Sequence, residues 1–164
     1  MKKVIYLFLI ILLLAVLDNT VITFLSIKYI YPSTLLVFVI AYAIINGPIE
    51  GIVVGIAAGA FQDLYFSSGM GINMFSNMII CLLASEIGKS IFKDKSIVPI
   101  VSTFFLSFLK GLLVIGILFL LRIKTIGITI VLYKALYDMI VSIFLYRLVF
   151  KLSETKIIKK EWRF

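Results

Sequence analysis

The chain has 164 residues, of which 63% are hydrophobic, with a mean hydropathy of +1.20 and a net charge of +8. A soluble core of this size needs far less apolar surface, so the composition excludes an ordinary soluble domain and predicts an integral membrane protein. The chain has no histidine and one cysteine, Cys81, which excludes an internal disulfide, a Cys/His metal cluster and catalysis by a Ser–His or Cys–His pair.

The apolar runs are long enough to cross about 30 Å of hydrocarbon, and their pattern predicts helices rather than barrel strands. The first run covers residues 4–27 after "MKK" and lacks a small-x-small cleavage site, so we expect an uncleaved anchor. The second covers residues 32–46. The third covers residues 48–66, where Pro48 suits a first helical turn and Glu50 suits the positive end of the helix dipole.

Three further helices are expected over residues 72–88, 97–121 and 126–152, separated by the polar stretches "KSIFKDKS" and "RIKT". The sequence therefore predicts an all-α bundle of six transmembrane helices in residues 1–152. A basic cytoplasmic tail is expected in residues 153–164.

Basic residues set the expected orientation, because lysine and arginine accumulate on the cytoplasmic side of membrane proteins. Both termini are placed in the cytoplasm, since few basic residues then fall outside: Lys28, Arg122 and Lys124. The cytoplasmic set is larger and consists of Lys2, Lys3, Lys89, Lys93, Lys95, Lys151, Lys156, Lys159, Lys160 and Arg163. The net charge is thus explained by orientation and by contact with anionic lipid, and we expect no nucleic acid partner.

Glycines recur at every fourth position in the third run, at Gly47, Gly51, Gly55 and Gly59. Successive steps of four drift by about 40° on a helix, so these glycines form one slanting groove. Small residues let helices approach closely inside a bilayer. The groove is predicted to pack against either another helix of the chain or a partner protein.

Polar residues inside the apolar runs are the other candidates for function, because they are unfavourable in hydrocarbon unless paired or hydrated. One possible polar functional site consists of Gln62, Asp63, Asn73 and Asn77; the alternative for Asp63 is a structural cap on the following turn. Lys134 and Asp138 stand four apart and can form an intrahelical pair. The intramembrane charges either hold the bundle together or form a proton or ion path: Asp18, Lys110, Lys134 and Asp138.

The layout resembles the MreD family of bacterial rod shape-determining membrane proteins. The resemblance is carried by "YPSTLLVFVIAYAI", in which proline opens the second helix, and by "GPIEGIVVGIAAGAFQDLYFSSGMGINMFS". In the second stretch a glycine-rich helix enters a G-x-x-x-D pattern and a glycine turn, here Gly55, Gly59, Asp63, Gly69 and Gly71.

The resemblance implies a non-enzymatic scaffold in the bacterial cytoplasmic membrane, without cofactor or metal. It would bind an MreC-like protein and act indirectly with MreB filaments, RodA and a class B penicillin-binding transpeptidase in peptidoglycan synthesis. The family is also similar in architecture to the six-helix substrate-binding subunits of energy-coupling-factor vitamin transporters, so a vitamin-binding subunit is the alternative. An intramembrane enzyme such as a lipid transferase is not expected, because no carboxylate pair shares one helix face near an interface.

Overall fold

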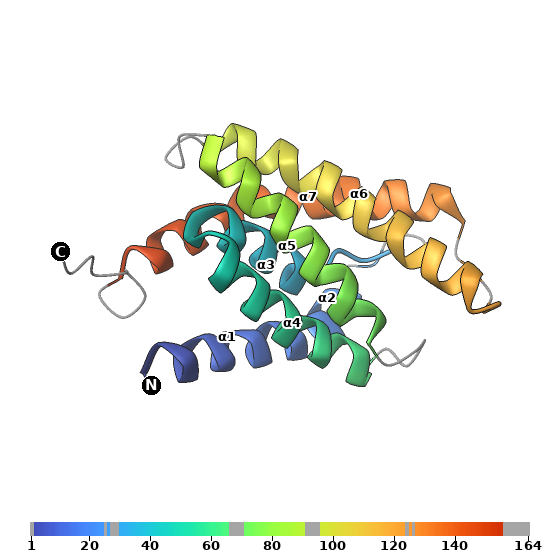
Figure 1. Cartoon of the computed structure of the whole chain (residues 1–164), viewed down its shortest axis with the longest axis horizontal. Coiled ribbons are helices and arrows are strands. Elements are labelled where there is room, and N and C mark those ends of the chain that lie inside the picture. The colour runs from blue at the N-terminus through green and yellow to red at the C-terminus, as the bar shows by residue number, and fades with distance from the viewer. Residues whose placement is uncertain are drawn as a thin grey trace.

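The computed structural model describes residues 2–24, 26, 30–65, 71–90, 96–123, 125 and 127–155 (Figure 1). All elements in these ranges are helices: α1 (Lys2–Asn19), α2 (Val21–Phe24), α3 (Thr34–Asn46), α4 (Pro48–Tyr65), α5 (Ile72–Ser90), α6 (Ile97–Leu120) and α7 (Ile128–Ser153). Several residues named above lie outside the described ranges: Lys28, Gly69, Lys93, Lys95, Lys124 and the tail beyond residue 155.

The prediction of an all-α fold is confirmed, and the five helices from α3 to α7 each begin and end within two residues of their expected ranges. The first run differs, because the helix breaks at Thr20, just after Asp18 and Asn19. By length and composition, α6 and α7 could each cross a membrane, whereas α3 is a shorter apolar helix.

Helix α3 is the centre of the bundle. Every residue from Thr34 to Ile44 is buried, and α3 contacts α1, α4, α5, α6 and α7. A helix that is apolar on all sides is expected in such a position, since it has no face suited to water. It ends at Gly47, whose φ of 90° favours glycine and whose N–H donates to the carbonyl of Ala43 at 3.0 Å. Pro48 then begins α4.

The first turn of α1 and the last turn of α7 lie at the same end of the bundle, here called the terminal end (Figure 1). Polar contacts tie four helices together there. Lys3 Nζ lies 2.7 Å from both carboxylate oxygens of Glu50, and the Tyr42 hydroxyl donates to Glu50 Oε2 at 2.9 Å. Asn46 Nδ2 donates to Ser153 Oγ at 3.0 Å.

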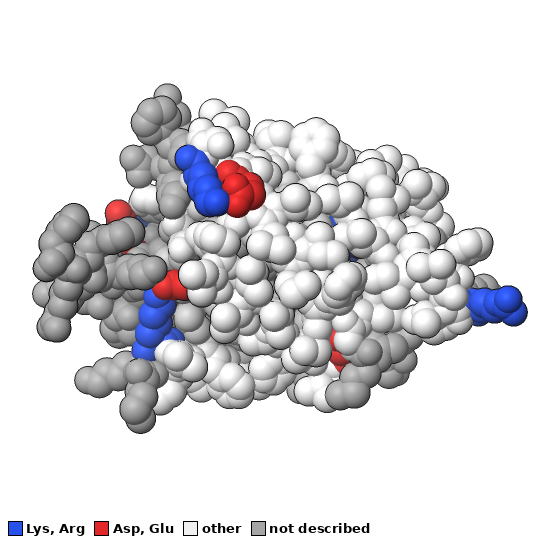
Figure 2. All heavy atoms as spheres, in the orientation of Figure 1, with Lys and Arg blue, Asp and Glu red and all other residues white. Residues whose placement is uncertain are grey.

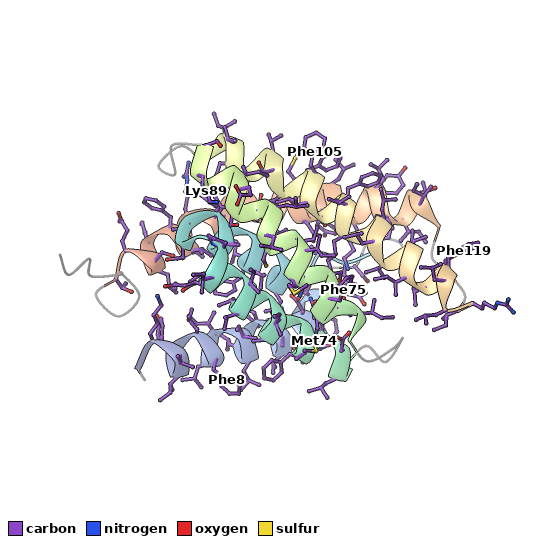
Figure 3. All side chains as sticks on the ribbon, viewed as in Figure 1. Phe8, Met74, Phe75, Lys89, Phe105 and Phe119 are labelled. Carbon is purple, nitrogen blue, oxygen red and sulfur yellow. The ribbon has the colours of Figure 1, made fainter. Side chains whose placement is uncertain are left out.

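At the opposite end, here called the hairpin end, α6 and α7 extend beyond the other helices (Figure 1). The charged side chains on the face drawn in Figure 2 lie mainly at the two ends of the molecule, and the surface between them is almost uncharged. Large apolar side chains point outward around this middle zone, including the labelled Phe8, Phe75 and Phe105 in Figure 3, and the exposed Phe119 continues the apolar surface toward the hairpin end. An apolar perimeter of this kind suits contact with hydrocarbon.

Candidate functional site

A carboxylate from α1 caps the start of the central helix. Asp18 is buried, and its two oxygens accept hydrogen bonds from the backbone N–H groups of Thr34 at 2.8 Å and Leu35 at 3.1 Å. The hydroxyl groups of Ser33 and Thr34 donate to the same carboxylate. The first N–H groups of a helix have no partner within it and carry a partial positive charge, so a buried anion is stabilised there.

Ser33 is the point at which several helices meet. Its N–H donates to Asp138 Oδ1 of α7 at 2.8 Å, and its hydroxyl donates to Asp18 Oδ2 at 2.9 Å. The same hydroxyl oxygen accepts from the Leu36 N–H at 3.2 Å and from Gln62 Nε2 of α4 at 3.3 Å. Ser33 therefore acts as the N-cap of α3 while joining α1, α4 and α7.

Gln62 extends these contacts to the two remaining long helices. Its Oε1 accepts from Asn77 Nδ2 of α5 at 3.2 Å and from Lys110 Nζ of α6 at 3.0 Å. The Ser107 hydroxyl of α6 also donates to Asp138 Oδ2. We call this set the polar network: Asp18, Ser33, Thr34, Gln62, Asn77, Ser107, Lys110 and Asp138. Its members come from all six long helices, and all are buried.

Asp63 forms a separate cap at the start of α5. Its carboxylate accepts from the backbone N–H groups of Gly71, Asn73 and Met74 at 2.9–3.1 Å and from Asn73 Nδ2 at 3.0 Å. Gly71 has a φ of 99°, which a residue with a side chain rarely adopts. Asp63 and Asn73 are therefore bonded to each other and to the backbone, whereas Gln62 and Asn77 belong to the polar network.

Three of the four predicted glycines face helices of the same chain. A Cβ atom at Gly51 would lie 2.6 Å from Ala43 Cβ, and one at Gly55 would lie 2.5 Å from Cys81 Sγ. One at Gly59 would lie 2.5 Å from Met74 Cα. The groove is filled by α3 and α5, which leaves no room there for a partner helix. Gly47 lies outside it, in the turn between α3 and α4.

The predicted pair between Lys134 and Asp138 is wrong, because the ion pairs formed within the described residues are Lys3–Glu50 and Lys89–Glu86. Asp138 turns instead toward the polar network. Lys134 Nζ lies 5.9 Å from the centre of the Tyr31 ring, which is a cation–π contact. The partners of both side chains therefore come from outside α7: Tyr31 precedes α3, Ser33 is its N-cap, and Ser107 belongs to α6.

The hydrogen bonds of the polar network stabilise the folded bundle. Its two carboxylates accept hydrogen bonds from backbone N–H and hydroxyl groups, which are the contacts that offset the loss of water around a buried charge. A hydrogen bond to a charged group contributes about 1.5–3 kcal/mol, so several such bonds hold the helices in one arrangement. Within the described residues, no group of three or more Asp, Glu, Cys or His side chains could hold a metal ion.

Ser33, Thr34 and Ser107 are network members that the sequence analysis missed. The sequence does mark Ser33 and Thr34, because Ser-Thr after Pro32 and before an apolar run is typical of a helix start. Nothing comparable identifies Ser107, which is one of several hydroxyl residues in α6.

The fold and this network define an all-helical membrane protein whose buried charges join its helices. A family model described as rod shape-determining protein MreD matches residues 1–156. The chain therefore belongs to the MreD family, and it has a role in rod shape determination. Searches of the curated proteins and of the solved structures gave no match.

Proposed function

We propose that the chain is a non-enzymatic membrane scaffold of the bacterial cell-elongation complex, which binds an MreC-like protein. The observation that carries this proposal is the polar network itself. Buried ionisable groups in a membrane protein commonly mark a substrate or ion path. Here the carboxylates of Asp18 and Asp138 are bonded to Ser33 and its neighbours, so their role is to join helices. A rigid bundle is what a scaffold needs.

The proposed topology has six membrane crossings with both termini in the cytoplasm, a transmembrane domain over residues 1–152 and a cytoplasmic tail over residues 153–164. The terminal end of the bundle is then the cytoplasmic end. Lys3, Lys89 and Lys151 lie at or near this end, in agreement with the tendency of basic residues to remain inside. The hairpin end then faces the periplasm.

The surface that best fits a partner helix is the half of α6 nearest the hairpin end. Beyond Lys110 only Leu118 is buried in this helix, whereas Phe119 and Leu120 are 75% and 81% exposed. Gly116 lies among these residues, and a Cβ atom placed on it would meet nothing within 4 Å. The other glycines inside described helices would meet an atom of the same chain at 2.6 Å or less: Gly51, Gly55, Gly59, Gly88 and Gly111.

Because Gly116 is exposed and has no side chain, the backbone of a partner helix can approach α6 closely at this position. Close approach at small residues is how helices associate in lipid. An MreC-like protein that enters the periplasm through one membrane helix would pack here. Contacts with MreB filaments, RodA and the class B penicillin-binding transpeptidase would then be made through that partner. In this arrangement the chain couples peptidoglycan synthesis to cell shape without chemistry of its own.

The proposal is tested by co-expressing the tagged chain with the MreC-like protein and measuring how much partner co-purifies. Gly116→Leu is expected to keep the bundle folded and to reduce the captured partner several-fold. The control is Val101→Phe, which adds bulk at an exposed position in the other half of α6 and should leave capture unchanged. If folded Gly116→Leu protein captures as much partner as the wild type, this surface is not the docking site.

A further inference from the structure

A second surface feature is a shallow groove on α7 near the terminal end, which we call the basic groove. It has a volume of about 300 Å³ and is lined by Ile143, Phe144, Arg147, Leu148 and Lys151. These residues share one face of the helix, because they are spaced one, four, five and eight positions from the first. The lining is thus aliphatic and aromatic toward the middle of α7 and basic toward its end.

The two cations of the basic groove have no acidic partner within the described part of the chain. Ion pairs there join Lys3 to Glu50 and Lys89 to Glu86, and both Arg147 and Lys151 are exposed. Attraction to the negative end of the helix dipole is confined to the last turn, so it accounts for Lys151 and not for Arg147. Two exposed cations on one helix face, with no acidic partner among the described residues, suit a negatively charged ligand.

The basic groove lies at the level of the membrane that a phospholipid of one leaflet occupies. Arg147 precedes the last residue of α7, Ser153, by six positions, or about 9 Å along the helix. A helix of 26 residues is about 39 Å long, which exceeds the hydrocarbon thickness of about 30 Å. Arg147 and Lys151 therefore flank the headgroup level of one leaflet, and Ile143, Phe144 and Leu148 lie at the depth of its acyl chains.

A second groove on α7, nearer the hairpin end, provides a useful contrast. It is larger, at about 530 Å³, but no charged side chain lines it: Ile30, Thr129, Ile130, Tyr133, Leu136, Tyr137 and Ile140. An uncharged lining gives no reason to select one lipid over another. The basic groove is thus the one of these two whose chemistry distinguishes among lipids.

We propose that the basic groove binds one anionic phospholipid of the cytoplasmic leaflet. Its phosphate lies between the Arg147 guanidinium and the Lys151 ammonium, and an acyl chain packs on Ile143, Phe144 and Leu148. Arginine suits this role because its planar group can donate two parallel hydrogen bonds to phosphate. The leaflet follows from the proposed topology, whereas lipid binding in detergent depends neither on that topology nor on an MreC-like partner.

The test is native mass spectrometry of the purified full chain with phosphatidylglycerol or phosphatidylcholine carrying identical acyl chains. The wild type is expected to retain phosphatidylglycerol preferentially. In Arg147→Gln/Lys151→Gln this preference should fall by about tenfold or more, because each basic residue contributes a several-fold attraction to anionic lipid. Arg147→Lys keeps the positive charge but cannot donate two parallel hydrogen bonds to the phosphate, so it should retain only part of the preference.

The matched control is Arg122→Gln, which removes an exposed cation at the hairpin end and should leave the preference unchanged. Phe144→Ala should weaken binding of both lipids equally, since Phe144 contacts only the acyl chain in this arrangement. Equal retention of the two lipids by the wild type would overturn the proposal. So would an undiminished preference in the double variant, or a double variant that instead loses capture of the MreC-like protein while lipid retention is unchanged.

Discussion

Asp18 on α1 accepts a hydrogen bond from the backbone N–H of Thr34 at 2.8 Å, so the end of the first long helix caps the start of the central one. The contact therefore joins the last turn of α1 to the first turn of α3. Because Ser33 also binds Asp138 on α7, this cap fixes α3 between helices from opposite sides of the bundle. The start of α3 therefore depends on contacts with other helices as well as on its own N-cap residue.

The first prediction concerns Asp18. Asp18→Leu removes the acceptor for four donors, so we expect it to lower the free energy of unfolding by about 2–4 kcal/mol, from loss of a cap and of charged hydrogen bonds. Asp18→Asn keeps one carbonyl oxygen and should lose less. Thermal unfolding of both variants in the same detergent measures the difference. An Asp18→Leu protein as stable as the wild type would show that the cap does not hold α3.

The second prediction concerns Asp63, whose cap is local to α5. Asp63→Ala should destabilise the start of that helix by about 1–2 kcal/mol, because three backbone N–H groups lose their acceptor. Hydrogen exchange should accelerate at the amides of Gly71, Asn73 and Met74. The amide of Val37, at the start of α3, serves as the internal control. Unchanged exchange at the three α5 amides would contradict the assignment.

The third prediction concerns the glycine groove. Gly59→Leu should prevent correct packing of α4 on α5, because a Cβ atom there already lies 2.5 Å from the backbone of Met74. Overpacking of this kind costs about 1–3 kcal/mol or more. Size-exclusion chromatography should therefore show much less folded Gly59→Leu protein than folded Gly116→Leu protein. Comparable yields of the two would mean that α4 and α5 are not closely packed.

The fourth prediction concerns Lys110, which is buried and donates to Gln62 Oε1. A buried charge that forms no ion pair is unfavourable. Lys110 forms none within the described residues, so an apolar side chain of similar length relieves that cost. Gln62 Oε1 keeps Asn77 as a donor, so Lys110→Met loses one hydrogen bond and should change the free energy of unfolding by no more than about 1 kcal/mol. Chemical unfolding in detergent tests this, with Lys110→Glu as a strongly destabilised comparison. A large loss in Lys110→Met would show that the ammonium group itself holds the network.

Helix positions were predictable from the sequence because the apolar runs are long and are interrupted by turn residues. Gly47 and Pro48 separate α3 from α4 by backbone properties that depend on no other part of the chain. The structural cap suggested for Asp63 was also open to local reasoning, since its partners follow within eleven residues.

The polar network was not predictable in the same way. Asp138 illustrates the reason, because the local rule for residues four apart pairs it with Lys134, whereas its partners Ser33 and Ser107 come from other helices. Which face of each helix turns inward, and at what depth, decides such contacts. A single sequence gives the spacing along a helix and does not give the alignment between helices.

Site-specific photo-crosslinking in cells tests the central claim most directly, namely that this chain is a scaffold whose α6 surface meets a membrane partner. A photoreactive aromatic residue would replace the exposed Phe119 in one strain and Val101 in another, with the MreC-like protein tagged, so that Gly116 itself stays free of bulk. We predict a crosslink to the MreC-like protein from position 119 and none from position 101. A crosslink from position 101 alone, or none from position 119 in a folded and functional protein, would contradict the account.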